Sequence, residues 1–344
     1  MTLPDVDSLV SSMSLEEKVG QLLIVGIEGH KLSDATSEFL SQGQFSGVIL
    51  FRRNIVTVDD GRKLLRGLKA LFPKERRPIL AVDEEGGRIT QIGHLLAAAP
   101  SAAKIGEARH QRSAFFYAKD TAQKLRWFGF NTVFAPVLDV NDEPRNPVIG
   151  DRSYGADVGV VEALGAAAVL GFKEGGVAPT GKHFPGHGSS TVDSHKALPV
   201  IRHAAERWYT FEFVPFRAAI ESNVPLIMTG HIACPALTAK EDLPATFSPR
   251  VVREILRDEF KFDGIVITDA LEMNAAATYM AGGHGPEEAL KAGCDLLLFA
   301  HGGKPALEAK TRIVEAVRRK RLSEKDVEES LRRVLTFRMG LPRV

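Results

Sequence analysis

The sequence is poor in cysteine and in long apolar runs. Only Cys234 and Cys294 occur among its 344 residues, and each lies inside an apolar stretch. This pattern argues against a disulfide-based scaffold and predicts buried thiols in a reducing compartment. No run of 18 or more apolar residues is present, and the first twenty residues lack a basic start followed by an apolar segment. We therefore expect a cytoplasmic protein without a secretory signal and without membrane insertion.

An excess of charge of either sign is also missing. The chain has 44 Lys and Arg residues against 43 Asp and Glu residues, so no strong field points to nucleic acid or to an anionic membrane. A small-molecule partner is the better expectation, and no nucleic-acid partner is predicted. The sequence does not indicate an oligomeric state, and a monomer is the simpler expectation.

Short apolar runs alternate with amphipathic stretches along the whole chain. Nearly all of these runs are continuously apolar, which is typical of parallel strands buried on both faces. Eight strands alternating with helices predict a single (β/α)8 TIM-type barrel over residues 1–344. An open doubly wound sheet is the alternative. The eight runs are Leu22–Val25, Gly47–Phe51, Pro78–Val82, Thr132–Val137, Val177–Gly181, Leu226–Thr229, Gly264–Thr268 and Asp295–Phe299.

Helix start signals lie between the runs. Ser14 followed by Glu17 has the spacing of a capping box and predicts a helix that leads into the first strand. Ser248-Pro249 supplies a cap and a first-turn proline before an amphipathic segment. Ser323 is expected to begin the last helix, which ends near Gly340.

Polar residues follow six of the predicted strands. In a (β/α)8 barrel the carboxyl ends of the strands meet at one face, where active sites form. A single polar cluster is explained by loop solubility or helix capping, but six at equivalent positions predict an active site. The clusters are Arg52–Asn54, Asp83–Arg88, Asp139 with Arg152 in the next loop, Lys182–Gly188, His231 and Asp269.

Two features among these clusters suggest acid–base and nucleophilic chemistry. Asp269 follows an apolar run and is a candidate carboxylate nucleophile, with a helix N-cap as the alternative role. Asp193 and His195 are two residues apart, so the carboxylate can orient the imidazole for general acid/base catalysis. The alternative for His195 is an ordinary solvated loop histidine.

Other chemistries use the same residue types. His183, His187, His195 and Asp193 could ligate a metal, although their spacing matches no common short zinc motif. Lys182 at a strand end could form a Schiff base, but the adjacent histidine favours a hydroxyl-binding lysine. A non-catalytic sugar-binding barrel would not need an Asp–His pair opposite a strand-end aspartate. We expect neither a metal nor an organic cofactor.

One long pattern is specific to a known family. Lys182-His183-Phe184-Pro185-Gly186-His187-Gly188 is followed after four residues by Asp193-Ser194-His195. On this pattern the sequence resembles glycoside hydrolase family 3, in its bacterial β-N-acetylglucosaminidase branch. The resemblance runs from Leu15 to the last helix. Further segments appear in the family's order: Asp83–Arg88, Phe134–Val140, Arg152–Tyr154 and Phe262–Asp269.

The resemblance implies an activity and a role for each candidate residue. The expected activity is that of a retaining exo-β-N-acetylglucosaminidase, which releases terminal β-linked N-acetylglucosamine through a covalent glycosyl-enzyme. Muropeptides in cytoplasmic cell-wall recycling are the implied substrates. Asp269 would be the nucleophile, and His195 with Asp193 the acid/base on a mobile loop. The sugar in the −1 subsite would be held by Asp83, Arg152, Lys182, His183 and His231.

Two alternative activities and one departure from the family remain. A β-glucosidase of this family usually has an additional αβα domain, for which this sequence leaves no residues, and an N-acetylglucosaminide phosphorylase stays open. A metal-dependent hydrolase is a more distant alternative. Gln91 stands where the family commonly has arginine; as a substrate-binding residue it can still hydrogen-bond a sugar hydroxyl, but it lacks the charge and the fork of arginine. Glu84 stands where glutamine is usual and adds a nearby negative charge, so we expect a differently tuned −1 subsite.

Overall fold

The eight strands close into one parallel barrel. The computed structural model describes residues 5–342, so residues 1–4 and 343–344 of the predicted 1–344 domain lie outside it. Each strand pairs with its sequence neighbours, and the first pairs with the last. The predicted (β/α)8 barrel is confirmed, and the open-sheet alternative is wrong. The strands are β1 (Leu23–Gly26), β2 (Gly47–Leu50), β3 (Ile79–Val82), β4 (Thr132–Val133), β5 (Ala178–Phe184), β6 (Leu226–Thr229), β7 (Ile265–Ala270) and β8 (Leu296–Phe299).

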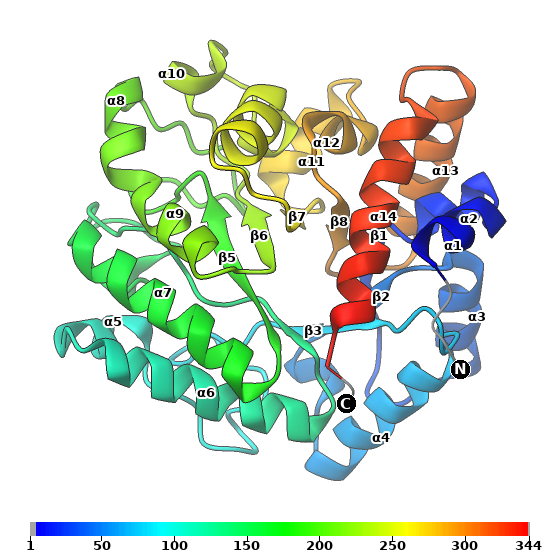
Figure 1. Ribbon diagram of the computed structural model, residues 1–344, viewed down its shortest axis with the longest axis horizontal. Helices are drawn as coiled ribbons and strands as arrows, with labels where there is room; N and C mark the ends of the chain where they lie inside the picture. The colour runs from blue at the N-terminus through cyan, green and yellow to red at the C-terminus, as the bar shows by residue number, and fades with distance from the viewer. Residues whose placement is uncertain (1–4, 343–344) are drawn as a thin grey trace.

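Helices surround the strands (Figure 1). Within residues 5–342 the α-helices are α1 (Val6–Ser12), α2 (Leu15–Gly20), α3 (Asp34–Gly43), α4 (Val58–Ala70), α5 (Ala102–Glu107), α6 (Gln111–Phe128), α7 (Val158–Gly175), α8 (Ala205–Arg207), α9 (Val214–Glu221), α10 (Pro235–Thr238), α11 (Asn274–Ala281), α12 (Glu287–Ala292), α13 (Lys304–Arg318) and α14 (Glu324–Gly340). Short 3₁₀ segments are η1 (Arg52–Asn54), η2 (Gly150–Arg152) and η4 (Ala245–Phe247), and π-helical segments are η3 (Trp208–Glu212) and η5 (Arg250–Glu259). None of the helices that the structure describes is both long enough and apolar enough to cross a membrane.

The hydrophobic core lies both inside the barrel and between its strands and the surrounding helices. Strands β1, β2, β3 and β8 consist of apolar residues and glycine and are buried throughout. Such strands need cover from inside the barrel and from the helices outside, which explains their continuous hydrophobicity. Helix α4 supplies one such cover, turning Leu64, Leu65 and Leu68 inward. Cys234 and Cys294 are buried free thiols, as the sequence predicts.

The structure confirms that helices begin at the three predicted positions. The Ser14 hydroxyl accepts a hydrogen bond from the Glu17 amide at 3.2 Å, and the Glu17 carboxylate accepts from the Ser14 amide at 3.0 Å. Helix α14 begins directly after Ser323 and ends at Gly340. The segment after Ser248-Pro249 is helical, but it has π rather than α geometry.

Three predicted strand boundaries are wrong in a way that matters for the site. Strand β4 ends at Val133 rather than Val137, and Pro136 in the following segment has no N–H to donate to a neighbouring strand. Strand β5 extends past Gly181 to Phe184, so Lys182 and His183 belong to the strand itself. Asp269 likewise lies within β7 rather than after it.

Both extended strands contain an extra residue relative to a neighbour. Strand β5 has one residue more than the facing stretch of β6, at Lys182-His183. Strand β7 has one more than the facing stretch of β8, at Thr268-Asp269. An extra residue interrupts the strict alternation of side chains and redirects them. The irregularities therefore fall on the candidate functional residues.

The capping box yields a stability prediction. Ser14→Ala removes an acceptor for a helix N-terminal amide and should lower the free energy of unfolding by about 1 kcal/mol. Urea unfolding followed by circular dichroism measures the change. The matched control is Ser12→Ala, which removes an exposed hydroxyl bonded only to the Leu9 carbonyl. Equal losses in the two variants would contradict the capping role.

Candidate active site

A buried lysine forms the centre of the polar network at the barrel mouth. The Lys182 ammonium contacts Asp83 Oδ1 and Glu85 Oε1, each at 2.7 Å, and its side chain is only 3% exposed. Burial lowers the pKa of Lys182, but the two carboxylates outweigh it and raise the pKa above its ordinary value. A lysine that stays protonated is a poor amine nucleophile. The Schiff-base alternative is therefore disfavoured.

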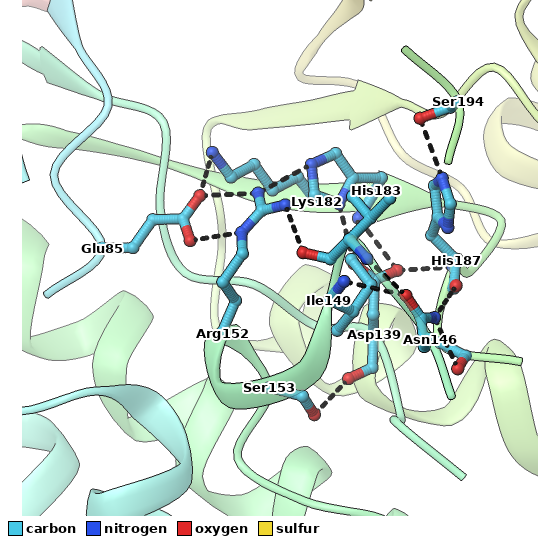
Figure 2. A network of polar contacts seen from close by, with 12 residues as sticks. Glu85, Asp139, Asn146, Ile149, Arg152, Ser153, Lys182, His183, His187 and Ser194 are labelled. Atoms are coloured by element: carbon cyan, nitrogen blue, oxygen red, sulfur yellow. Dashed lines mark hydrogen bonds and ion pairs between the residues drawn. The ribbon is translucent and has the colours of Figure 1, made fainter. Parts of the chain in front are cut away.

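Glu85 connects this lysine to Arg152. The guanidinium donates two hydrogen bonds of 2.8 Å to the two Glu85 oxygens, in the fork-to-fork geometry that suits arginine and carboxylate (Figure 2). Burial raises the pKa of Glu85, but Lys182 and Arg152 together hold it well below its usual range. Gly86 and Gly87 adopt φ of +91° and +55°, a turn that needs glycine directly after this carboxylate.

His183 lies between Arg152 and Asp139. Its Nε2 is 3.3 Å from the Arg152 guanidinium, and its Nδ1 is 2.7 Å from Asp139 Oδ2. Because arginine can only donate, Nε2 accepts from it and the Nδ1 proton is donated to Asp139. This assignment places the ring in one tautomer and one orientation.

Asp139 fixes the backbone as well as the ring. The buried carboxylate also accepts hydrogen bonds from the His183 amide at 3.2 Å and the His187 amide at 2.7 Å. Burial raises its pKa, but the contacts with His183 and His187 outweigh that effect and lower the pKa below its ordinary value. An ionised carboxylate with this many donors holds the end of β5 in place.

Asp269 and His231 occupy the neighbouring part of the mouth. The Asp269 carboxylate accepts from the Ala270 amide at 2.7 Å. Burial raises the pKa of Asp269, but nearby His183 and His231 outweigh it, so the pKa lies below its ordinary value. His231 contacts Thr246 at 2.9 Å and the Ala270 carbonyl at 3.1 Å, and burial lowers its pKa. The carboxylate is thus ionised at neutral pH beside a positioned imidazole.

The structure brings Asp193 and His195 into contact. Asp193 Oδ1 lies 2.9 Å from both the imidazole Nδ1 and the backbone amide of His195. Burial raises the pKa of Asp193, but these bonds outweigh it and lower the pKa. The His195 side chain is 63% exposed. Within residues 5–342 no hydrogen bond or ion pair joins it to Asp269 or to the Lys182 network.

Gln91 and Glu84 serve the loop that follows β3. The Gln91 side-chain oxygen accepts from the Arg52 amide at 2.8 Å, which ties this loop to the one after β2. The buried Glu84 carboxylate accepts from the amides of Gln91 and Ile92, at 2.7 and 3.1 Å, and from the Thr90 hydroxyl. The Glu84 carboxylate is thus engaged within its own loop. Burial raises the pKa of Glu84.

The three histidines of the β5 region have separate partners. His183 contacts Asp139 and Arg152, His187 contacts Ser194, and His195 contacts Asp193. In the part of the chain that the structure describes, no group of three or more His, Cys, Asp and Glu side chains is arranged to hold a metal ion. This arrangement does not support the metal-centre alternative.

Sequence reasoning missed the residues that support the others. Glu85 and Asp139 were visible as strand-end carboxylates, but nothing in the sequence showed which side chains they would contact. His187 was considered only as a metal ligand, and Ser194 lay inside the recognised pattern without an assigned role. The one sequence signal that all four share is that they are polar residues close to a stronger candidate. Such residues are too common for this signal to select them.

Comparison with known proteins identifies the family. The model of the glycosyl hydrolase family 3 N-terminal domain matches residues 14–337. Beta-hexosaminidase A of Pseudoalteromonas piscicida is 31% identical over 329 residues, covering 89% of this chain and 55% of that protein. The beta-hexosaminidase of Thiobacillus denitrificans is 37% identical over 287 residues, covering 81% of this chain and 78% of that protein.

A solved structure gives the same answer. The family 3 beta-N-acetylglucosaminidase of Paenibacillus sp. str. FPU-7 superposes with a TM-score of 0.91 at 38% identity. The alignment covers 95% of this chain and 62% of that one, so this chain spans less than two thirds of two of these three relatives. The match over nearly the whole barrel nevertheless settles the family: the chain belongs to glycoside hydrolase family 3.

Proposed function

We propose that this chain is a retaining exo-β-N-acetylglucosaminidase that hydrolyses terminal β-linked N-acetylglucosamine. The observation that carries the proposal is the ionised Asp269 carboxylate at the barrel mouth, combined with the Asp193–His195 pair on the loop after β5. The relatives named beta-hexosaminidase and beta-N-acetylglucosaminidase support the sugar specificity.

The chemistry divides into two displacements at the anomeric carbon. In the first, an Asp269 oxygen forms a bond to that carbon, the bond to the aglycone oxygen breaks, and His195 gives this oxygen its proton. In the second, His195 takes a proton from water, the water oxygen attacks the same carbon, and the ester to Asp269 breaks. Two inversions give net retention. The acetamido group of the sugar is not the nucleophile.

Asp193 supports both steps. Its carboxylate orients the imidazole through Nδ1, which leaves Nε2 to exchange the proton with the aglycone or with water. It also stabilises the imidazolium that forms when His195 acts as a base. The exposure of His195 fits an acid/base that approaches the substrate from the open side of the barrel.

The −1 subsite uses the network around Lys182. Asp83, with a side chain 23% exposed, is the open member of that network and can accept from sugar hydroxyls. Arg152, Lys182, His183 and His231 complete the proposed subsite. Their buried ion pairs and hydrogen bonds hold the donors in place before the sugar arrives, which reduces the cost of ordering them on binding.

The wider context is proposed on the same basis. Residues 1–344 form one catalytic domain that acts in the cytoplasm as a monomer on small glycosides or muropeptides of cell-wall recycling. Balanced charge and two free, buried cysteines support this setting. No nucleic acid, metal or organic cofactor takes part in the proposed reaction.

Phosphate is a second candidate acceptor. The acid/base of this site is an imidazole, and a neutral imidazole repels a phosphate anion less than a carboxylate would. Turnover measured with and without phosphate, with identification of free sugar or sugar 1-phosphate as the product, separates phosphorolysis from hydrolysis.

The nucleophile assignment is tested with Asp269→Ala. Release of p-nitrophenol from p-nitrophenyl β-N-acetylglucosaminide should fall by several orders of magnitude, because no covalent intermediate can form. The wild type should prefer this substrate to the corresponding glucoside. The matched control is Asp258→Ala, which removes an exposed carboxylate on the outer segment η5. Retained turnover in Asp269→Ala would remove this residue from its proposed role.

The acid/base assignment is tested with His195→Ala. The loss should reach roughly 100-fold or more on substrates with a poor leaving group, because general acid catalysis typically contributes that much. With a good leaving group such as p-nitrophenol, the loss should be much smaller. The ratio kcat/KM, which reports the first displacement and not the shared second one, measures this dependence on a series of aryl β-N-acetylglucosaminides. A loss of the same size on every substrate would contradict the assignment.

The departure at Gln91 also has a measurable consequence. Gln91→Arg restores the residue that is common in the family and should change the selectivity between the acetamido sugar and glucose. It also removes the side-chain acceptor of the Arg52 amide, so a thermal unfolding scan must accompany the kinetics. Gln123→Arg on the exposed face of α6 is the control. Unchanged selectivity would show that position 91 does not tune the subsite.

A further inference from the structure

The residue between Asp193 and His195 differs from both in its surroundings. Ser194 is 2% exposed, whereas the neighbouring His195 side chain is 63% exposed. The Ser194 hydroxyl lies 3.1 Å from His187 Nε2, and its carbonyl accepts from the Ala275 amide of α11 at 3.3 Å. Figure 2 shows the His187 ring directed at this hydroxyl.

These two bonds connect the loop to the rest of the barrel. Among residues 191–197, all of which the structure describes, Ser194 alone has hydrogen bonds to groups beyond residues 189–197. The remaining bonds of this stretch join loop residues to one another, as between Ser190 and Val192. The position of His195 relative to the barrel therefore depends on its buried neighbour.

His187 is a rigid anchor for this loop. Its amide donates to Asp139 at 2.7 Å, and its carbonyl accepts from the Asn146 side chain at 2.9 Å. Its ring packs edge-on against His183, with centroids 6.2 Å apart. Asp139 holds both histidines, so the bond from His187 to Ser194 links the loop to the proposed −1 subsite.

The His187 ring acts as a hydrogen-bond donor rather than as an acid. Its Nδ1 is buried and has no hydrogen-bond partner within residues 5–342. A buried N–H without an acceptor is costly, so the favoured tautomer has its proton on Nε2 and donates it to Ser194. A second proton would sit on Nδ1 without an acceptor. Burial lowers the pKa of His187 to about 4 despite nearby Asp139, so the ring is neutral at neutral pH.

We propose that His187 and Ser194 are positioning residues for the acid/base step. Their side-chain hydrogen bond, together with the contact from Ser194 to α11, holds the Asp193–His195 pair where His195 can reach the aglycone oxygen. Proton transfer needs donor and acceptor about 3 Å apart, so a small displacement of an exposed imidazole removes it from range. The inference rests on the proposed function, because it takes His195 as the acid/base.

Ser194→Ala is the main test, because it removes the hydroxyl and leaves both members of the pair unchanged. On aryl β-N-acetylglucosaminides with poor leaving groups, kcat/KM should fall roughly tenfold, the effect of losing one well-placed hydrogen bond. With p-nitrophenol as the leaving group the loss should stay below about threefold, since protonation matters less there. Inhibition by free N-acetylglucosamine should not change, because the sugar subsite is intact.

His187→Phe is the second variant, since it keeps an aromatic ring and removes the donor. If the bond between the two side chains is what matters, the double variant should lose no more than the larger single loss. Ser189→Ala is the matched control in the same loop, because that hydroxyl bonds to Asp142 and contacts neither His187 nor His195. Circular dichroism and thermal unfolding establish that each variant is folded.

Three outcomes would overturn the inference. The first is wild-type behaviour of Ser194→Ala, the second is an equal loss on good and poor leaving groups, and the third is losses of the two variants that multiply in the double variant. If His195→Ala shows a leaving-group dependence while Ser194→Ala shows none, the inference alone fails. If His195→Ala itself shows none, the proposed acid/base role fails as well.

Discussion

The pairing of Glu85 with Lys182 and Arg152 is the interaction on which the rest of the site depends. One cationic side chain, Lys182, lies buried at the barrel mouth and a second, Arg152, is only 11% exposed, so an unpaired charge there would carry a large desolvation cost. Glu85 offsets that cost by accepting from both. Removal of one partner from such a pair typically costs about 3–5 kcal/mol, because it leaves a buried charge uncompensated. The network thus places strong constraints on the identity of each member.

The ion pairs of Glu85 also orient the groups that would meet the substrate. Arg152, held by Glu85, donates to His183 and thereby selects its tautomer, while Asp139 holds the other ring nitrogen. Lys182 contacts Oδ1 of Asp83, and no hydrogen bond to the second Asp83 oxygen occurs within residues 5–342. Asp269 lies in the field of these cations and imidazoles, so its carboxylate stays ionised. In its proposed role as nucleophile, a carboxylate in that state would need no activating base.

The three histidines of the β5 region differ in how deeply they are buried and in what they contact. His183 and His187 are buried and held in place, because each hydrogen-bonds to the Asp139 carboxylate. His195 is exposed, and within residues 5–342 its side chain bonds only to Asp193, which suits its proposed role of exchanging a proton with an incoming substrate. Ser194 connects the buried histidines to the exposed one, because it is buried, bonds to His187 and directly precedes His195 in the chain.

The sequence by itself determined the barrel and the location of its active face. Continuously apolar strands such as Leu226–Thr229 need cover on both sides, and eight of them alternating with helices satisfy that need in a closed barrel. The polar residues after those runs marked the face of the candidate site, and the spacing of Asp193 and His195 made their contact possible. These features are local, so patterning along the chain reveals them.

Only the tertiary structure decided which polar groups meet. The extra residues at Lys182-His183 and Thr268-Asp269 arise from pairing with neighbouring strands, and no local pattern encodes that register. Glu85 meets its two cations through contacts between distant segments, whereas Glu84 and Ser194 bond to partners seven residues away that only the folded loops bring into reach. Such choices depend on which charge is buried beside which partner, and burial is a property of the folded chain.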